Sequence, residues 1–343
     1  MSKKATTVEA TPAPAAEPQD NLTKLREIAG KYNKYMNAQY QAEVSYVPDT
    51  KSKAAVVVRK WLELPEQLQY AMNLPGLPFG HITQVYGKKD SGKSSLLMQA
   101  ISSAQAQGIL PILILTEHKF DFERLTNYMG GDPNAMIVLE ADDLETGFTY
   151  LEKILRDVRS GKLVLDTGEK DKDGKSVDTV IDVSNQPVFI FWDSIGGTLS
   201  RAELEGDVED WSKDMGRGAQ ALKKMVKRSA QLLNKVKDRV GILFLNQVWT
   251  ARTPTGIQYD KPAGGETVQH YYAIEIQLKR GQEIKMDFQG RSMGIGYSIE
   301  MRMVKNHVNH NRMRSDLIAV AEGLLDPDEL DAFKKRYKKN LKD

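Results

Sequence analysis

Residues 87–94 read Gly-Lys-Lys-Asp-Ser-Gly-Lys-Ser and fit the pattern G-x-x-x-x-G-K-[ST] of a phosphate-binding loop. The loop follows a strand-like run, 81–86, and precedes a helix-favouring stretch, 95–106. Its glycines let the backbone curl so that N–H groups point at phosphate oxygens, and the helix that follows adds its positive end. The alternative is a chance glycine turn, but the flanking segments favour a site for a nucleoside triphosphate.

The side chains of this loop supply the rest of the chemistry. Lys93 can place its charge between the two outer phosphates, and Ser94 can ligate magnesium. The predicted nucleotide-binding residues of the loop are Gly87, Asp90, Ser91, Gly92, Lys93, Ser94 and Ser95.

Acidic residues mark the ends of two apolar, strand-like runs. Asp193 ends the run 188–193, where a phosphate-binding loop needs a carboxylate for magnesium; the alternative is that it caps the next segment. Glu117 follows the run 111–116 and can orient and deprotonate an attacking water, provided a water fits between it and the last phosphate. The alternative is that Glu117 is an ordinary acid at a strand end.

Gln247 follows a third apolar run, 240–246, and can hydrogen-bond the terminal phosphate. The loop after it, 249–265, is long, and such loops are usually functional or disordered. Its basic and aromatic residues fit phosphate contact and base stacking, whereas the alternative is a mobile hairpin connection. The segment 212–239 carries a basic helix face, which is either solvated or a track for a nucleic-acid backbone.

The composition excludes several classes of protein. The chain of 343 residues has ordinary hydrophobic (41%) and charged (27%) fractions, and its net charge is +2, so any polyanion binding must come from local clusters. It has no cysteine, which excludes disulfides, thiolate zinc sites and cysteine nucleophiles. Because the sequence shows neither an apolar run of about 18 residues nor a signal-peptide pattern, we expect a cytoplasmic protein with no membrane partner.

The order of apolar and helix-favouring segments predicts the fold. Continuous apolar strands separated by helices predict an α/β fold, with a mostly parallel twisted sheet and helices on both faces. Later strand-like segments joined by short turns predict antiparallel strands at the C-terminal end. The predicted strands are 81–86, 111–116, 136–140, 188–193, 240–246, 271–279 and 295–304, and the predicted helices are 94–107, 120–129, 143–159 and 212–238.

The same patterns divide the chain into regions. We expect residues 1–19 to be a disordered tail, and 20–70 to be a helix and strand that are either an extra layer on the core or a subunit-docking arm. The core spans 71–322 and is interrupted at 160–187 by a surface β-hairpin insertion, because strand-like flanks enclose a turn-prone Lys-Asp-Lys-Asp-Gly-Lys. Residues 323–343 form a basic helix whose order of charges suits the helix dipole.

Taken together and in this order, the motifs resemble those of the RecA family of DNA strand-exchange proteins over roughly residues 70–320, with phage-type recombinases as the nearest match. The resemblance implies a RecA-type core that binds ATP near Asp121 and Arg124, with Mg²⁺ held by Ser94 and Asp193. It also implies catalysis by Lys93, Glu117 and Gln247, joined by Lys305 from a neighbouring subunit. The segments that carry the resemblance are Pro78–Gly80, Gly87–Ser94, Thr116–Asp121, Phe191–Ser194, Ala202–Asp207, Asn246–Gln247, Gly264–Gly265 and Met303–Asn306.

The resemblance further implies that protomers polymerise as a helical filament on single-stranded DNA, hydrolyse ATP when DNA is present, and promote homologous pairing and strand exchange with double-stranded DNA. Single-strand-binding and mediator proteins are the implied accessory partners. The alternatives are a ring-forming replicative helicase with the same core and a nucleotide-gated mediator that barely hydrolyses. The implied DNA-binding residues are Arg201, Glu203, Gly206, Arg217, Arg252, Thr253, Tyr259, Lys261, Gly264 and Gly265.

The sequence departs from the bacterial pattern at several positions. Arg124 stands where bacterial members carry a tyrosine near the adenine, and its guanidinium plane can stack instead. His307 replaces a second lysine two positions after Lys305, which can weaken the contact across subunits or make it depend on pH. The Gln269-His270 region replaces a basic residue after the glycine pair. The family's C-terminal domain has no expected counterpart beyond the basic helix.

Overall fold

The computed structural model describes residue 58 and residues 60–117, 119–170, 172–174, 176–205, 217–252, 255–256 and 258–341. The chain divides into two units, 1–53 and 54–343, and every described residue belongs to the second. The expected tail and the greater part of the expected docking arm therefore lie outside the described residues. Among the helices that the structure describes, none is long and apolar enough to cross a membrane.

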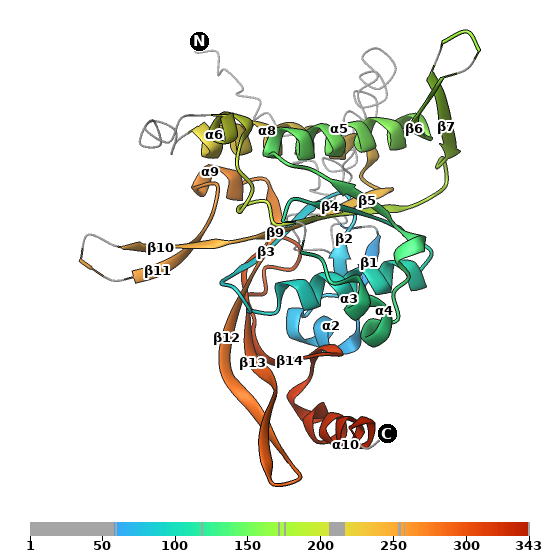
Figure 1. Ribbon diagram of the computed structural model, residues 1–343. Helices are drawn as coiled ribbons and strands as arrows, with labels where there is room; N and C mark the ends of the chain where they lie inside the picture. The colour runs from blue at the N-terminus through green and yellow to red at the C-terminus, as the bar shows by residue number, and fades with distance from the viewer. Residues whose placement is uncertain are drawn as a thin grey trace, which may run out of the picture. The chain divides into compact units, whose positions relative to one another are not determined.

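A nine-stranded sheet forms the centre of the second unit, in the order β15-β14-β13-β12-β3-β9-β8-β4-β5 (Figure 1). Every residue of β3 and β9 is buried, as expected of parallel strands covered on both faces. The predicted α/β class is confirmed, and each predicted parallel strand matches the observed one to within one residue. The parallel strands are β3 (Ile82–Gly87), β9 (Val240–Asn246), β8 (Val188–Asp193), β4 (Leu110–Leu115) and β5 (Ile137–Glu140).

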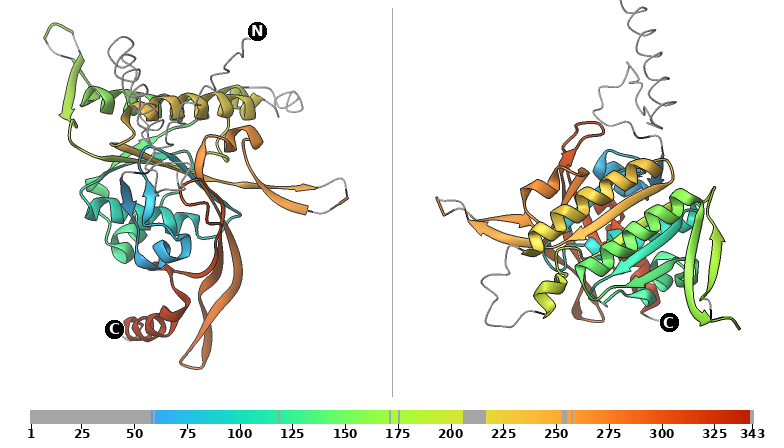
Figure 2. Two further views of the ribbon diagram at one scale, coloured as in Figure 1. Left: turned by 180° about the vertical axis from the view of Figure 1, so that it is seen from behind. Right: turned by 90° about the horizontal axis from the view of Figure 1, so that it is seen from above.

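Helices cover both faces of this sheet (Figures 1 and 2). One core cluster contains Leu96 and Ile101 of α3, both fully buried, and the other contains Leu151 of α5 and Val226 of α8. The segment predicted as one helix at 212–238 is described from Arg217, and its last part is a 3₁₀ turn instead of α-helix. The first face carries α2 (Glu66–Met72), α3 (Lys93–Ala106) and α4 (Phe122–Met129); the second carries α5 (Leu144–Ser160), α8 (Arg217–Leu233) and η3 (Asn234–Val236).

Short elements complete these layers. The strands β1 and β2 pair antiparallel, and the fully buried Leu62 and Leu68 join the core on the α3 face. Residues 61–72 therefore pack as part of the core layer. The short elements are β1 (Trp61–Glu63), β2 (Gly76–Pro78), η1 (Pro133–Ala135), α6 (Arg201–Glu205) and α9 (Glu266–Gln269).

The C-terminal end of the sheet is antiparallel, as predicted, but its strands are longer than the sequence indicated. β12 pairs with β3 only as far as Leu278, and its outer part continues with β13 as a long hairpin that leaves the sheet (Figure 1). There Met286 and Phe333 lie in a small core of their own, which anchors the C-terminal helix α10. The elements are β12 (Tyr272–Phe288), β13 (Arg291–Asn306), β14 (Arg314–Val320), β15 (Gly323–Leu325), η4 (Pro327–Glu329) and α10 (Leu330–Asn340).

Two further hairpins leave the layered core. β6 (Lys162–Lys170) and β7 (Ser176–Asp182) pair antiparallel, as predicted for the insertion at 160–187. The prediction of a long loop at 249–265 is wrong. The strands β10 (Val248–Arg252) and β11 (Gln258–Pro262) pair antiparallel over most of this segment. β-branched and aromatic residues favour an extended backbone, so the hairpin alternative describes this segment.

Candidate nucleotide-binding site

The phosphate-binding loop lies between the carboxyl end of β3 and the start of α3. A Cβ at Gly87 would collide with the carbonyl oxygen of Leu278 and with Oγ of Ser91, so only glycine fits there. Gly92, with φ of 89°, turns the chain into α3 in a conformation that favours glycine. The two glycines therefore allow the tight turn that brings the N–H groups of the loop and the N-terminus of α3 to the same side of the loop.

Lys93 is the first residue of α3, and its ammonium group folds back over the loop. Its Nζ donates to the carbonyl oxygens of Gly87 (2.9 Å) and Lys88 (2.8 Å). Burial lowers the pKa of Lys93, and the carboxylates of Asp193 and Glu117 oppose that shift. A half-buried cation that is held by neutral carbonyls can exchange them for phosphate oxygens.

A cavity of about 610 Å³ opens beside the loop, at the carboxyl ends of four parallel strands. In open parallel sheets, ligands bind at this edge. We call it the phosphate cavity; it is lined by Gly87–Asp90, Lys93, Ser94, Leu115, Glu117, Lys119, Asp193, Ser194, Gln247 and Val248. The structure thus brings together the side chains that the sequence placed at the ends of β3, β4, β8 and β9.

Asp193 has a pKa that its position in this cavity shifts. Burial, together with the nearby carboxylate of Glu117, raises the pKa of Asp193 to about 6, although the charge of Lys93 acts in the opposite direction. A buried carboxylate of this kind is stabilised by a cation, and Ser94 lines the same cavity. In the part of the chain that the structure describes, no group of three or more acidic or histidine side chains forms a metal cage. This donor set fits Mg²⁺, which is usually held by one or two carboxylates, phosphate oxygens and water.

Glu117 and Gln247 contact each other across the cavity. The amide Nε2 of Gln247 donates to Oε1 of Glu117 (2.5 Å) and lies 3.3 Å from Oγ of Ser194. Gly197 packs against this pair, because a Cβ there would lie 2.5 Å from Nε2 of Gln247 and 2.7 Å from Oε1 of Glu117. Sequence reasoning missed Ser194 and Gly197 as site residues, although the Gly196-Gly197 pair just after the Asp193 strand was a usable signal.

A hydroxyl network fixes the ends of the neighbouring strands β4 and β8. Thr116 donates from Oγ1 to the carbonyl oxygen of Asp193 (3.0 Å), and Thr198 donates to Oγ1 of Thr116 (2.7 Å). These bonds set the spacing between the strand ends that carry Glu117 and Asp193. No local pattern in the sequence points to them, since the partners are about 80 residues apart.

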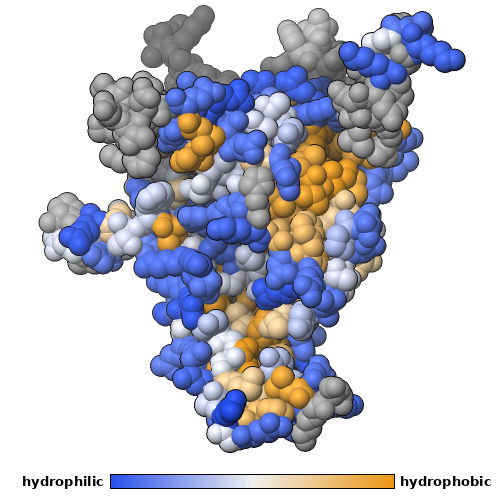
Figure 3. Space-filling view, in the orientation of Figure 1, coloured by the Kyte–Doolittle hydropathy of each residue, from blue (hydrophilic) through white to orange (hydrophobic). Residues whose placement is uncertain are grey.

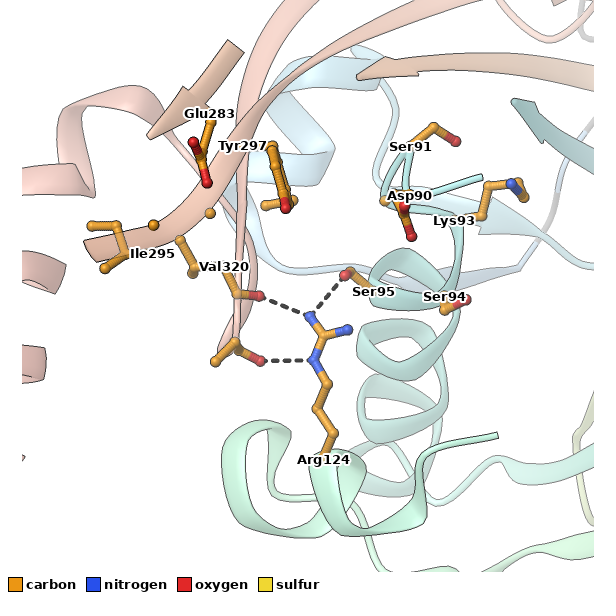
Figure 4. Close-up of a pocket in the computed structure, with 15 residues that line it drawn as sticks. Asp90, Ser91, Lys93, Ser94, Ser95, Arg124, Glu283, Ile295, Tyr297 and Val320 are labelled. Carbon is orange, nitrogen blue, oxygen red and sulfur yellow. Dashed lines mark hydrogen bonds between the residues drawn. The ribbon is translucent and has the colours of Figure 1, made fainter. Parts of the chain in front are cut away.

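A second cavity, of about 430 Å³, lies on the other side of the loop (Figure 4). We call it the Arg124 cavity. The guanidinium group of Arg124 enters it and donates to Oγ of Ser95 (2.8 Å) and to the carbonyl oxygens of Val320 (2.8 Å) and Ala321 (3.0 Å). These hydrogen bonds lie at the edge of the guanidinium and fix its plane, so that its flat face can stack on a ring. The cavity is lined by Asp90–Ser95, Arg124, Glu283, Gly294–Tyr297 and Ala319–Ala321.

Tyr297 and Glu283 are lining residues of the Arg124 cavity that sequence reasoning missed (Figure 4). They belong to the long β12–β13 hairpin, which lies about 200 residues after the loop, so no local sequence pattern connects them with it. The guanidinium of Arg280 stacks 3.4 Å above the Tyr297 ring, and it also pairs with Asp90 of the loop at 3.3 Å. Asp121, predicted beside Arg124, accepts from the backbone N–H of Arg124 and caps α4.

The residues predicted to bind DNA are spread over several elements. Arg201 pairs with Asp143 at 3.2 Å, and Glu203 accepts from Oγ of Ser200 at 2.7 Å, so both have structural partners. Arg252 is exposed on β10, and the same strand carries Trp249, which is 65% exposed and was not predicted. Tyr259 and Lys261 lie on β11, Gly264 and Gly265 separate it from α9, Arg217 begins α8, and Gly206 and Thr253 lie outside the described residues.

Lys305 lines neither of the two cavities described above. It lies on β13 opposite the buried Glu275 of β12, and its Nζ donates to the carbonyl oxygen of Gln269. Burial raises the pKa of Glu275 to about 7, although Lys305 lowers it. Burial also lowers the pKa of His307, helped by the positive charge of Lys305, so this histidine is favoured in its neutral form.

Comparison with known proteins adds a family match. A family model described as the RecA N-terminal domain matches residues 63–167 and 161–324. The RecA protein of Chlorobaculum tepidum is 28% identical over 244 residues, which are 70% of this chain and 59% of that protein. The RecA protein of Sulfurovum sp. is 29% identical over the same shares. For the RecA protein of Tropheryma whipplei, at 27% identity, the match covers 47% of its length. The chain therefore spans less than two thirds of the length of these curated relatives.

Proposed function

This chain belongs to the RecA family, and we propose that it is an ATP-dependent recombinase that polymerises on single-stranded DNA and promotes homologous pairing and strand exchange. The observation that carries the proposal is the phosphate cavity, where Lys93, Glu117 and Asp193 converge on one space. A protein that only stores or senses a nucleotide has no need for a carboxylate beside the outer phosphate. Within the family, we propose a phage-type member, since identity to bacterial RecA proteins is low and Arg124 and His307 depart from the bacterial pattern.

The nucleotide chemistry follows from the side chains of the phosphate cavity. Lys93 leaves the carbonyls of Gly87 and Lys88 and binds oxygens of the outer phosphates. Ser94 and Asp193 are the residues that would hold Mg²⁺, which neutralises phosphate charge when it is bound. Glu117 would accept a proton from the water whose oxygen attacks the γ-phosphorus. The bond between that phosphorus and the oxygen that bridges it to the β-phosphate breaks, so a nucleoside diphosphate and inorganic phosphate are released.

The Arg124 cavity would hold the base of the nucleotide. It borders the loop opposite the phosphate cavity, and both cavities share Asp90, Lys93 and Ser94. Arg124 offers a flat cation and Tyr297 an aromatic ring, and both stack on a purine. This stacking suits any purine, and ATP is the proposed nucleotide because the chain belongs to the RecA family, with Asp121 and Ser95 near its adenine side.

Gln247 would connect hydrolysis to DNA binding. Its amide contacts Glu117, and β10 begins at the next residue. A terminal phosphate competes with Glu117 for this amide, so the position of Gln247 and of β10 depends on the state of the nucleotide. The DNA contacts would come from Trp249, Arg252 and Lys261 on the hairpin and from the segments around Arg201 and Arg217.

Assembly into a filament would use surfaces on both sides of the protomer. The edge strand β5 has half-buried Ile137, Val138 and Leu139, and Figure 3 shows hydrophobic surface over this side of the sheet. Among the strands that the structure describes, β5 ends the sheet and pairs with β4 alone, and an edge strand of this kind offers a pairing site for another chain. We propose that the segment 20–58 of a neighbouring copy docks on this edge, and that Lys305 of one copy completes the phosphate cavity of the next.

The test is ATP hydrolysis and strand exchange with purified full-length chain. Hydrolysis should rise sharply with single-stranded DNA, and Lys93→Ala should abolish both activities, because the outer phosphates lose their charge partner. Lys172→Ala, at the exposed turn of the β6–β7 hairpin, is the matched control and should keep wild-type rates. Hydrolysis that is indifferent to DNA would contradict recombination. Closed rings in electron micrographs would favour a helicase, and DNA binding without turnover would favour a mediator.

A further inference from the structure

Lys88 of the phosphate-binding loop forms an ion pair with Asp260 of the β10–β11 hairpin. The ammonium Nζ of Lys88 lies 3.1 Å from Oδ1 of Asp260. The lysine side chain is 62% exposed, whereas the aspartate is 18% exposed. Asp260 is thus largely shielded from solvent, whereas the side chain of its partner Lys88 is mostly exposed. The pair joins the nucleotide loop to the hairpin at a point away from the hairpin base.

Other contacts fix the base of this hairpin. Asn246 donates from Nδ2 to the carbonyl oxygen of Ala263 (3.0 Å), and the N–H of Ala263 donates to the carbonyl oxygen of Gln247 (3.1 Å). Asp260 lies farther along, opposite Thr250 in the hairpin register. An interaction at that position can change the angle of the hairpin without unfolding its base. Figure 1 shows β10 and β11 extending away from the layered core, so a small change at Asp260 moves the outer parts of both strands.

Lys88 also borders two different spaces. It lines the phosphate cavity, and it lines a third cavity of about 510 Å³ under the hairpin, which we call the hairpin cavity. Its carbonyl oxygen accepts from Nζ of Lys93, the residue that must move toward a triphosphate. The hairpin cavity is lined by Tyr86, Lys88, Thr250, Gln258, Asp260, Gln277, Lys279, Arg302 and Val304.

We propose that the Lys88–Asp260 pair is a latch that holds the hairpin against the phosphate-binding loop when no nucleotide is bound and opens when a triphosphate binds. This inference rests on the proposed function, because it assumes that the hairpin contacts DNA. The phosphates draw Lys93 away from the carbonyl of Lys88 and offer the Lys88 ammonium several anionic oxygens in place of one carboxylate. Asp260 then loses its partner and turns toward Lys279 or Arg302, the other cations of the hairpin cavity.

The expected size of the effect is small but measurable. Exposed ion pairs contribute weakly to stability, so opening this one shifts the hairpin equilibrium by roughly two- to fivefold. A shift of that size tunes the difference in DNA affinity between the nucleotide-free and ATP-bound states and leaves the chemistry at the phosphate intact. The latch therefore weakens DNA binding by the nucleotide-free protein by the same small factor.

The experiment compares Asp260→Asn with wild type in two measurements. The first is the affinity for a fluorescein-labelled single-stranded oligothymidine, with and without a nonhydrolysable ATP analogue and Mg²⁺. The second is amide hydrogen exchange of residues 248–262 without DNA. Asp287→Asn, on an exposed part of β12, removes the same charge elsewhere and is the matched control. Lys88→Met and the Lys88→Met/Asp260→Asn double variant complete the cycle.

In wild type, the analogue should strengthen DNA binding and speed exchange in the hairpin. In Asp260→Asn, the nucleotide-free protein should already bind DNA roughly two- to fivefold more tightly and exchange fast, and the double variant should show no further gain. Wild-type behaviour of Asp260→Asn in both measurements would overturn the latch. If wild-type DNA affinity itself ignores the analogue, the proposed function fails, while hydrogen exchange still decides whether the nucleotide opens the hairpin.

Discussion

The phosphate cavity and the β10–β11 hairpin meet at Gln247 and Val248, yet they are held in place by different forces. The cavity residues Lys93, Asp193 and Gln247 follow or end strands with buried interiors, and the packing of two hydrophobic clusters fixes the positions of these strands. The strands of the hairpin are mostly exposed or half-buried, and the contacts that position them include hydrogen bonds at the base and the ion pair between Asp260 and Lys88. Buried packing is stiff, whereas exposed polar contacts cost little to break.

This difference suggests a division of work between the two regions. Chemistry at a phosphate needs groups that keep their geometry through the reaction, which buried strand ends provide. A DNA-contacting element that responds to nucleotide must have two positions of similar free energy, which weak contacts permit. Substitutions in the cavity should therefore change the rate of hydrolysis, and substitutions on the hairpin should change DNA affinity with little effect on hydrolysis.

Glu117→Gln should give the largest effect. The amide cannot accept the proton of the attacking water, so hydrolysis with single-stranded DNA should fall about 10²- to 10⁴-fold. Nucleotide affinity, measured with a fluorescent ATP analogue, should stay within a few fold of wild type, because the phosphate contacts of Lys93 remain. A variant that hydrolyses at wild-type rate would remove Glu117 from the proposed mechanism.

Gly197→Ala should give the next largest effect. The new methyl group meets Nε2 of Gln247 at 2.5 Å and Oε1 of Glu117 at 2.7 Å, so the pair must separate. We expect hydrolysis to fall roughly tenfold, because catalytic groups that are displaced by a fraction of an ångström lose rate steeply. Gly174→Ala, at the turn between β6 and β7, adds the same methyl group where no described atom outside the two neighbouring residues lies within 4 Å, although its φ of +79° strains the backbone there. It therefore controls for a loss of stability without a clash at the cavity, and thermal melting compares the two variants.

Trp249→Ala tests the hairpin alone. An aromatic side chain that is 65% exposed is available to stack on a base, and its removal should weaken binding to single-stranded DNA roughly fivefold. Hydrolysis at saturating DNA should stay near wild type, since the cavity is untouched. Tyr128→Ala, which removes an exposed aromatic from α4, should change neither quantity. Equal losses in both variants would show that the hairpin has no special role.

Asp193→Asn should give the smallest effect, on stability as a function of pH. The pKa of Asp193 is raised from 3.8 to about 6 in the folded protein. The contribution of Asp193 to the free energy of unfolding is therefore fully present below the pKa of the unfolded state and is lost as the pH rises through about 6. The asparagine variant does not titrate at this position and has no such loss. The stability of the variant relative to wild type should therefore rise by about 1 kcal/mol between pH 5 and pH 7 in urea titrations of nucleotide-free protein. A difference that does not change with pH would contradict the raised pKa.

Much of the cavity could be predicted because its residues carry local signals. The glycine and lysine spacing of 87–94 and the polar residues at the ends of apolar strands identify Lys93, Glu117, Asp193 and Gln247 without any tertiary information. Parallel strands then place these ends at one edge of a sheet, and the structure has them lining one cavity. The hairpin segment was predicted as a loop, since its short strands are exposed and their hydrophobic pattern is weak.

The sequence by itself determined the parallel core and the side chains that line the phosphate cavity, because the alternation of strands and helices and the glycine-rich loop follow from local patterns of apolar residues and glycine. Only the tertiary structure decided which distant residues complete the site. Tyr297, Gly197 and the Lys88–Asp260 pair depend on the path of the β12–β13 hairpin, on the turn after β8 and on the β10–β11 hairpin. Such contacts join residues far apart in the chain, and their geometry is set by the packing of whole layers.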